Sequence, residues 1–88
     1  MKNIDENVRA AVMYGEWFAD CNTIVATNNG RFSVVLHGSK IADGTTDGHG
    51  DFNVDFATFA GYPTNTTSRR LRALGVDTKA LRKKEGYA

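Results

Sequence analysis

The chain has 88 residues with an ordinary composition, 41% hydrophobic and 24% charged, and a formal net charge of +1. This length predicts a single domain, residues 1–88, because such a chain can bury roughly 60–65% of its unfolded surface. No apolar run approaches the roughly 20 residues that a bilayer crossing needs, and residues 1–10 lack the apolar core of a secretory signal. The single cysteine, Cys21, excludes an intramolecular disulfide, so we expect a protein of the reducing cytoplasm.

The charge is distributed unevenly along the chain. Residues 1–62 hold four Lys or Arg against eight Asp or Glu, a balance of −4, whereas residues 63–88 hold seven against two, a balance of +5. This asymmetry favours an acidic partner at the C-terminal end, within a screening length of about 10 Å at ordinary salt.

Residues 4–18 predict an amphipathic helix, because their apolar residues recur at helical spacing. Asn3 can cap this helix, and Glu6 follows three residues later, as in a weak capping box. Gly15 either ends the helix or allows a strand to approach closely. The apolar stripe consists of Ile4, Val8, Ala11, Val12, Gly15 and Phe18.

Residues 21–27 and 31–37 predict a β-hairpin, because Asn29-Gly30 suits a two-residue type I′ turn between them. That turn sets the pairing of the two strands and places one apolar set on the core face. The expected pairs are Thr27 with Phe32, Val25 with Val34, and Thr23 with Leu36. Val25, Phe32, Val34 and Leu36 then share the core face, and Ile24 and Val35 share the other.

The middle of the chain predicts two further strands joined by a glycine-rich connection. Gly38 turns the chain into a short third strand at residues 40–42, and residues 43–50 follow as a flexible loop. A strand then begins at residue 51 and ends near Gly61, because Pro63 pushes the preceding residue toward extended geometry. Its alternation predicts a buried face formed by Phe52, Val54 and Phe56.

The C-terminal part predicts two short helices. The first begins within residues 65–67, turns Leu71 and Leu74 inward, and stops at Gly75. Asp77 can cap the second, with Val76 and Leu81 spaced as a hydrophobic staple, and Gly86 closes it. The fold class predicted is therefore α+β: an N-terminal helix, a small antiparallel sheet of three or four strands with the helices on one face, and two short C-terminal helices.

Basic residues and hydroxyls in the C-terminal part predict a surface for an acidic partner. We expect the three arginines of residues 69–72 on the helix face away from Leu71 and Leu74, beside free amides at the helix N-terminus that attract anions. The alternative interpretation is an ordinary solvated face beside a satisfied helix cap. The candidate partner-binding residues are Thr66, Thr67, Ser68, Arg69, Arg70, Arg72, Lys79, Arg82, Lys83 and Lys84.

Aromatic residues form a second candidate contact surface. Tyr14 and Trp17 are three residues apart, off the apolar stripe of the first helix, so they either cover the core or a sheet edge or form a protein interface. Tyr62 and Tyr87 could join such an interface.

Other groups that could carry chemistry have structural interpretations that we favour. His37 precedes a turn and is expected to bond a turn carbonyl, and Cys21 is expected to be a small buried residue, although the pair could also be a base and a nucleophile. Residues 43–51 contain three aspartates and His49, but their spacing fits no calcium loop or zinc site. We therefore expect no metal, no cofactor and no catalytic residues.

Three sequence elements, in their order and spacing, resemble a loose group of small, mostly uncharacterised bacteriophage proteins. They are N-T-x-V at residues 22–25, L-H-G-x-x-I-A at residues 36–42, and G-aromatic-x-T-x-T-T-x-R-L-x-A-L at residues 61–74, and the resemblance covers roughly residues 8–75. The group more often has Trp where Tyr62 stands, one basic residue before the leucine where this chain has Arg69 and Arg70, and Asn where Arg72 stands. The extra arginines are therefore particular to this chain. The resemblance implies a phage origin and an α+β order, and it supplies no catalytic residues.

These observations favour a small phage binding protein of the host cytoplasm that acts stoichiometrically on a host protein or nucleoprotein complex. Host takeover or anti-defence is the expected role, for example inhibition of a CRISPR effector or a polymerase. Direct nucleic-acid binding through the basic helices is one alternative, and a virion component is another. A small enzyme using His37 or residues 43–51 is disfavoured, and the oligomeric state stays open.

Overall fold

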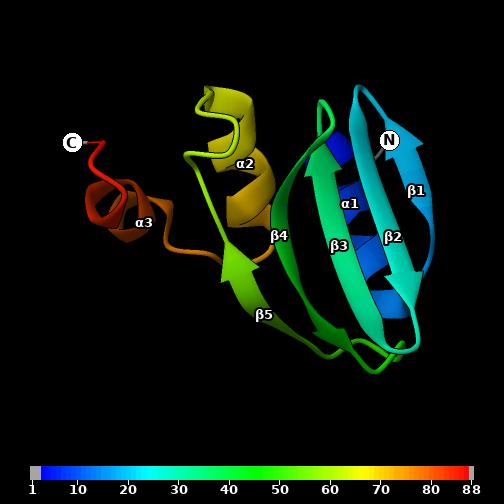
Figure 1. The fold of residues 1–88 in the computed structure, drawn as a ribbon. Helices are drawn as coiled ribbons and strands as arrows, with labels where there is room; N and C mark the ends of the chain where they lie inside the picture. The colour runs from blue at the N-terminus through cyan, green and yellow to red at the C-terminus, as the bar shows by residue number, and fades with distance from the viewer. Residues whose placement is uncertain (1–2, 88) are drawn as a thin grey trace.

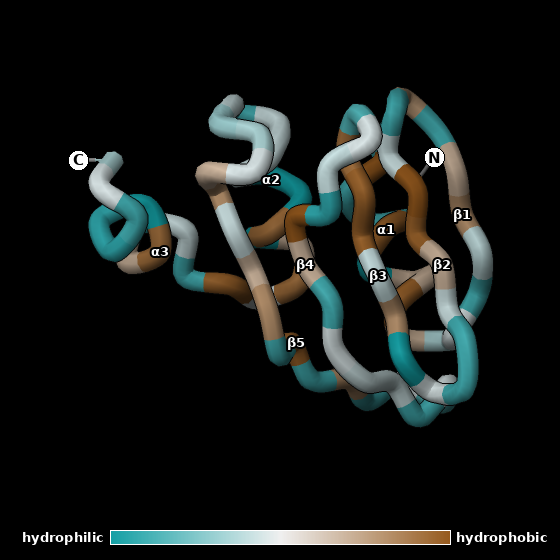
Figure 2. Tube along the Cα trace, viewed as in Figure 1, coloured by the Kyte–Doolittle hydropathy of each residue, from teal (hydrophilic) through white to brown (hydrophobic). Residues whose placement is uncertain are grey.

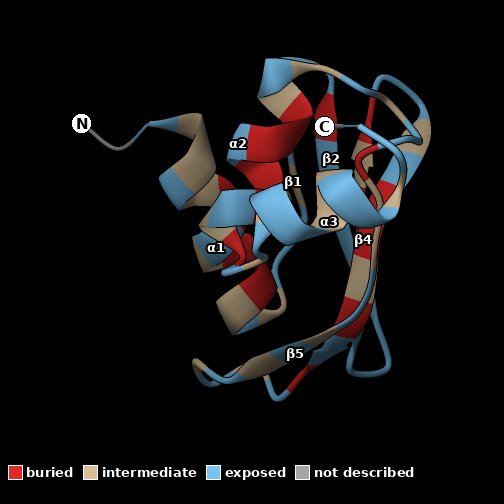
Figure 3. Ribbon diagram, turned by 90° about the vertical axis from the view of Figure 1, so that its left-hand side faces the viewer, coloured by how far each residue is buried: buried red, intermediate tan, exposed pale blue. Residues whose placement is uncertain are grey.

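The computed structural model describes residues 3–87, in which one five-stranded antiparallel sheet is accompanied by three helices. The strands follow one another in the order β1-β2-β3-β4-β5, and α1 and α2 lie on the same face of the sheet, with α3 beyond β5 (Figures 1 and 3). This arrangement confirms the predicted α+β class, with five strands in place of three or four. The elements are α1 (Ile4–Tyr14), β1 (Phe18–Asp20), β2 (Thr23–Asn28), β3 (Arg31–Leu36), β4 (Ser39–Thr46), β5 (Phe52–Ala57), α2 (Asn65–Ala73) and α3 (Thr78–Lys84).

Three two-residue turns join the first four strands. Both residues of each turn have positive φ, between 49° and 80°, as type I′ hairpin turns require. The turns are Cys21–Asn22, Asn29–Gly30 and His37–Gly38. The predicted register of the central hairpin is confirmed, with Thr23 opposite Leu36, Val25 opposite Val34, and Thr27 opposite Phe32.

Strand β1 replaces the last turn of the predicted N-terminal helix. Asn3 caps α1 as expected, its side-chain oxygen accepting from the Glu6 N–H at 2.9 Å. Gly15, with φ of 65°, ends the helix immediately after Tyr14. Phe18 therefore reaches the core from the sheet, where it lies opposite Val25.

Strand β4 extends into the segment predicted to be a flexible connection. It pairs with β3 as far as Thr45 and with β5 as far as Thr46, so only residues 47–51 form the loop. Gly44 is buried within β4, and a Cβ there would lie 1.9 Å from the Asn53 carbonyl oxygen. Glycine is therefore required at this position because the β5 backbone approaches so closely that no side chain fits, and not because the chain is flexible there.

A β-bulge in the β4–β5 ladder reverses the predicted alternation of β5. Val54 lies opposite Gly44 but Phe56 lies opposite Asp43, which leaves Asp55 as the extra residue. Consequently Phe56 is 42% exposed instead of buried, and Ala57 packs against the core in its place. The strand also ends at Ala57, earlier than the predicted Gly61.

The core lies between the inner face of the sheet and the helices α1 and α2. The hydrophobic stretches of β2, β3 and β4 lie beside those of α1 (Figure 2). The predicted core face of the hairpin is confirmed, as are the inward positions of Leu71 and Leu74. The buried cluster consists of Val8, Ala11, Val12, Val25, Phe32, Val34, Leu36, Ile41, Ala42, Leu71 and Leu74.

Candidate functional site

Helix α3 is a short basic helix whose start is fixed by its cap. The Asp77 side chain accepts a hydrogen bond from the Ala80 N–H at 3.1 Å, as predicted. Leu81 and Val76 pack against the core cluster from this end of the chain. Because these two residues anchor the helix, its cations can project from the remaining surface.

The end of α3 is held by the carboxylate of Glu85. One oxygen accepts from the Thr58 hydroxyl at 2.5 Å, and the other accepts from the N–H groups of Phe59 at 2.6 Å and Ala60 at 3.0 Å. Burial by itself raises the pKa of Glu85, but these three hydrogen bonds and the nearby Lys84 outweigh it and lower the pKa below its ordinary value of 4.5. The ionised carboxylate therefore ties α3 to the segment that follows β5.

Phe59 positions a cation and an aromatic ring at the surface. This side chain is 5% exposed, the Arg82 guanidinium carbon lies 4.7 Å from the centre of its ring, and the Tyr87 ring packs edge-on at 5.1 Å. The Tyr87 N–H also donates to the Arg82 carbonyl at 2.7 Å. Arg82 and Tyr87 are thus fixed on one side of α3.

Four cations surround a hollow of about 580 Å³ on this side of α3, which we call the basic pocket. Within residues 3–87, none of its cations forms an ion pair, and the Arg82 Nε atom is buried without a hydrogen-bond partner. Uncompensated positive charge of this kind attracts anionic groups. The basic pocket is lined by Arg72, Thr78, Lys79, Arg82, Lys83 and Tyr87.

The arginines of α2 do not share one exposed face, so that prediction is wrong. Arg70 is 4% exposed, and its guanidinium donates from Nε to the Thr23 hydroxyl at 3.2 Å and from Nη1 to Asp5 at 2.5 Å. Arg69 is exposed and lies 3.6 Å from the other Asp5 oxygen. Of the three, only Arg72 lines the basic pocket. Arg70 is buried because α2 packs this side chain between α1 and β2.

Two hydroxyls at the start of α2, those of Thr64 and Thr67, are hydrogen-bonded within the protein, whereas the buried Ser68 hydroxyl has no partner among the described residues. Thr64 caps the helix, one residue before the predicted range, by accepting from the Thr67 N–H at 3.3 Å. Thr67 and Ser68 are buried, and the Thr67 hydroxyl donates to the Tyr62 carbonyl. Thr66 is half-buried. The predicted anion site at this helix start is therefore confined to its exposed rim.

The predicted aromatic residues occupy different surroundings. Trp17 is 70% exposed and Tyr14 is 52% exposed at the junction of α1 and β1, so neither is a core residue, and edge cover and a protein interface both stay predictions for them. Tyr62 is half-buried and stacks on the His37 ring, with centroids 4.7 Å apart. Tyr87 is 38% exposed in the basic pocket.

His37 and Cys21 both lie in tight turns with left-handed backbone. The His37 backbone N–H donates to the Asn22 carbonyl at 2.8 Å, and its ring stacks on Tyr62. Among the described residues, the ring has no bond to the turn carbonyl that we expected. Cys21 is exposed, and the prediction of a buried residue is wrong because this position belongs to the β1–β2 turn.

The acidic loop after β4 is organised by its own backbone. The Asp47 carboxylate accepts from the N–H of His49 at 2.7 Å and of Asp51 at 3.1 Å, and the first of these bonds lowers the pKa of Asp47 below 3.8. Over residues 3–87, no group of three or more His, Cys, Asp or Glu could hold a metal ion.

Phe59, Thr78 and Glu85 contribute to the site and were missed from the sequence. Phe59 had been assigned to a strand, and nothing in its sequence surroundings marks it as a ring beneath a cation. Glu85 directly follows two lysines and precedes Gly86, which is the one signal that could have indicated a carboxylate at a helix end.

The comparison with protein-family models identifies a family for this chain. The model of the protein family described as "Kyanoviridae Gp96 protein" matches residues 1–86, which confirms the resemblance to bacteriophage proteins. No curated protein and no solved structure matches significantly. In the part of the chain that the structure describes, no helix has the length and apolar character that crossing a membrane would need.

Proposed function

The chain belongs to the Kyanoviridae Gp96 family of cyanophage proteins, and from this premise we propose that it acts by binding a host macromolecule stoichiometrically, without catalysing a reaction. The partner would be a host protein with an acidic surface or a nucleoprotein complex, such as a CRISPR effector or a polymerase. The expected setting is the host cytoplasm, and the expected outcome is takeover or suppression of a defence.

The observation that supports this proposal is the uncompensated charge of the basic pocket. Elsewhere in the described chain, charged residues form five ion pairs, in which Arg31, Lys40, Arg69 and Arg70 contact aspartates. Among residues 3–87, the cations of the basic pocket have no such partners, although the chain as a whole has a net charge of only +1. Charge that is left unpaired in one place favours association with a complementary surface.

The test compares two adjacent lysines of α3. Lys83 lines the basic pocket, whereas Lys84 is also exposed on the same helix but lies outside the pocket. Tagged wild-type protein is titrated into purified host CRISPR effector and polymerase complexes, and the bound ratio and affinity are measured. We expect a one-to-one complex whose affinity falls about tenfold or more in Lys83→Glu and much less in Lys84→Glu. The measurement is made at physiological salt, where charges more than about 8 Å apart are largely screened from each other.

Two outcomes would count against the proposal. Equal effects of the two substitutions would show that only net charge matters, and the absence of any stoichiometric complex from these targets and from host lysate would remove the binding role. Recovery of the protein as a stoichiometric constituent of purified phage particles would instead indicate that it is a virion component.

Direct nucleic-acid binding is the second candidate, and the exposed ring of Tyr87 within the basic pocket favours it. Cations that contact phosphates beside a ring on which a base can stack are the features of single-strand binding. Binding to a fluorescent single-stranded oligonucleotide should then weaken with salt, with a log–log slope of about −0.7 for each phosphate contacted. Undetectable binding at low salt, or a slope that Lys79→Glu leaves unchanged, would exclude this candidate.

A further inference from the structure

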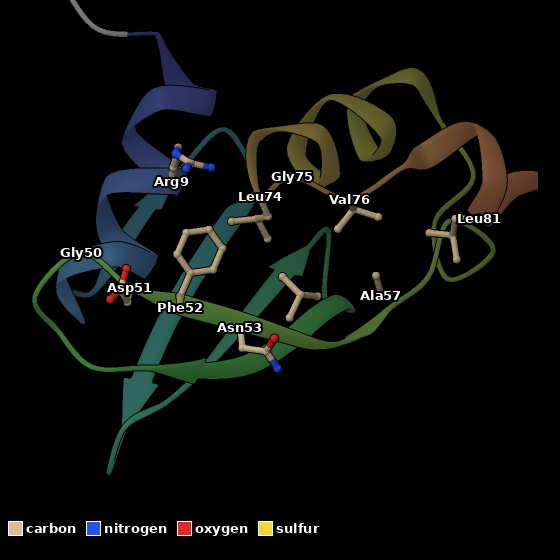
Figure 4. Close-up of a pocket in the computed structure, with 11 residues that line it drawn as sticks. Arg9, Gly50, Asp51, Phe52, Asn53, Ala57, Leu74, Gly75, Val76 and Leu81 are labelled. Atoms are coloured by element: carbon tan, nitrogen blue, oxygen red, sulfur yellow. The ribbon is translucent and has the colours of Figure 1, made fainter.

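A groove runs along the inner face of β5, on a different side of α3 from the basic pocket. It has a volume of about 670 Å³, and Figure 4 shows its side chains lying between β5, the start of α3 and α1, with Arg9 at the α1 end. The Arg9 guanidinium donates to the Ala73 carbonyl at 2.9 Å and lies 5.3 Å from the centre of the Phe52 ring, so it forms a fixed wall. The apolar lining consists of Phe52, Val54, Ala57, Leu74, Val76 and Leu81.

The groove borders a free edge of the sheet. Within the described chain β5 pairs only with β4, so one row of its backbone groups has no strand partner. The bonds that flank this ladder run from the Asp47 N–H to the Asp51 carbonyl and from the Thr58 N–H to the Ile41 carbonyl. In an antiparallel ladder, residue pairs that exchange hydrogen bonds alternate with pairs that do not, so the two flanking bonds determine which β5 residues bond to β4. The backbone groups of Asn53 and Phe56 therefore face β4.

The alternation leaves the backbone groups of Phe52, Val54 and Ala57 on the free edge. All three also line the groove, where they supply the apolar part of the β5 lining beside the polar Asn53. A strand that bonded to this edge would place its own alternate side chains beside them, over Leu74 and Val76. The edge and the groove thus fit the same occupant, which is an extended chain with apolar residues at every second position.

The charges around β5 indicate what the intervening residues of that chain would be. Among the four aspartates of residues 43–55, Asp43 and Asp55 pair with Arg31 or Lys40, whereas Asp47 and Asp51 form no ion pair with any described residue. Basic side chains in the occupant would complement these two carboxylates, whereas Arg9 already donates to the Ala73 carbonyl at the α1 end of the groove. A second copy that placed Phe52 opposite Val54 would also set Asp51 opposite Asp55, which like charges disfavour.

We propose that the free edge of β5 and its groove bind an extended segment of a partner protein, by strand addition, in which apolar residues alternate with basic ones. The segment forms a sixth strand beside β5 and fills the groove with its apolar side chains. This surface is separate from the basic pocket, so the two can be tested independently.

The probe for this proposal is a short synthetic peptide that alternates valine and lysine. The controls are a peptide of the same composition in scrambled order and one that alternates valine with glutamate. Binding is followed by calorimetry, and amide hydrogen exchange locates it. We expect the alternating valine–lysine peptide alone to bind, with protection of the Phe52 and Val54 amides.

Two pairs of matched variants test the edge and the groove separately. Val54→Pro removes a backbone N–H on the free edge of β5 and leaves the hydrogen bonds to β4 in place. Ala19→Pro is the control on the opposite edge of the sheet. Ala19 pairs with Ile24, one step from the β1–β2 turn, in a pair that exchanges no hydrogen bonds, so its N–H also faces outward. Val76→Lys places a cation in the groove, and Ile24→Lys places one on an exposed apolar residue of β2. We expect the first member of each pair to weaken peptide binding about tenfold or more, and the second to change it little.

Several results would overturn the proposal. These are no binding of the valine–lysine peptide, equal binding of the scrambled or glutamate peptide, and protection that maps to the basic pocket. Unchanged affinity in folded Val54→Pro protein would exclude strand addition. Edge protection that grows with protein concentration in the absence of peptide would show that the occupant is a second copy of the chain.

Discussion

Replacing Arg70 by alanine should destabilise the protein far more than the same change at a neighbouring arginine. The guanidinium is 4% exposed and bonds both Asp5 and the buried hydroxyl of Thr23, so its removal leaves an acceptor and a hydroxyl without their donor. Breaking a buried pair in this way costs about 3–5 kcal/mol. The Asp5 side chain is 22% exposed and keeps Arg69 at 3.6 Å, so we expect the lower end, about 3 kcal/mol.

The matched control is Arg72→Ala, on the same helix. Arg72 is exposed and unpaired among the described residues, so its loss should change the free energy of unfolding by no more than about 0.5 kcal/mol. For a domain of this size, 3 kcal/mol corresponds to a fall in melting temperature of about 12–24 °C. Urea and thermal unfolding followed by circular dichroism measure both. Equal stability of Arg70→Ala and Arg72→Ala proteins would refute the structural role of Arg70.

Three further predictions concern stability and accessibility. Gly44→Ala should lower the free energy of unfolding by about 2 kcal/mol or more, because its Cβ would overlap the Asn53 carbonyl; unchanged urea unfolding would contradict the close approach. Glu85→Gln should cost about 1 kcal/mol at neutral pH. Because the folded-state pKa of Glu85 is lowered, its contribution is present above pH 4.5 and disappears as the pH falls through the folded pKa, so the two unfolding curves should converge in acid. Cys21 should react with a thiol reagent in the folded protein as fast as a model peptide does, and slow reaction would contradict its exposure.

The parts of the fold that could be predicted are those specified by local chemistry. The Asn29-Gly30 turn fixed the central hairpin and its register, and capping residues located the starts of α1 and α3. The Cys21–Asn22 turn has the same geometry without a glycine, so the sequence does not mark it and β1 was missed. The two turns thus share one backbone geometry, but only Asn29-Gly30 has the residues that identify such a turn in a sequence.

The errors beyond β1 arise from contacts between segments far apart in the chain. The sequence predicts a flexible loop at Gly44, because the Asn53 carbonyl that requires this glycine comes from another strand. It predicts a solvent-facing Arg70, because the partners Asp5 and Thr23 lie 65 and 47 residues away. The bulge that exposes Phe56 likewise exists only in the pairing of two strands.

The same reasoning explains which parts of the candidate site were found. We predicted Arg72, Lys79, Arg82 and Lys83 from their charge alone, because the sequence shows directly which residues are basic. That they surround one hollow depends on the Phe59 ring and the Glu85 carboxylate, which tertiary packing brings to them.

The central claim is that the basic pocket is where this protein binds an anionic partner. The most direct measurement is a titration of isotope-labelled protein with a short polyglutamate peptide and, separately, with a single-stranded oligonucleotide, followed by nuclear magnetic resonance. The account predicts that at least one of them shifts the resonances of Lys79, Arg82, Lys83 and Tyr87 together, saturably and in a salt-dependent manner. Shifts that are absent, spread evenly over all exposed cations, or confined to another surface would contradict it.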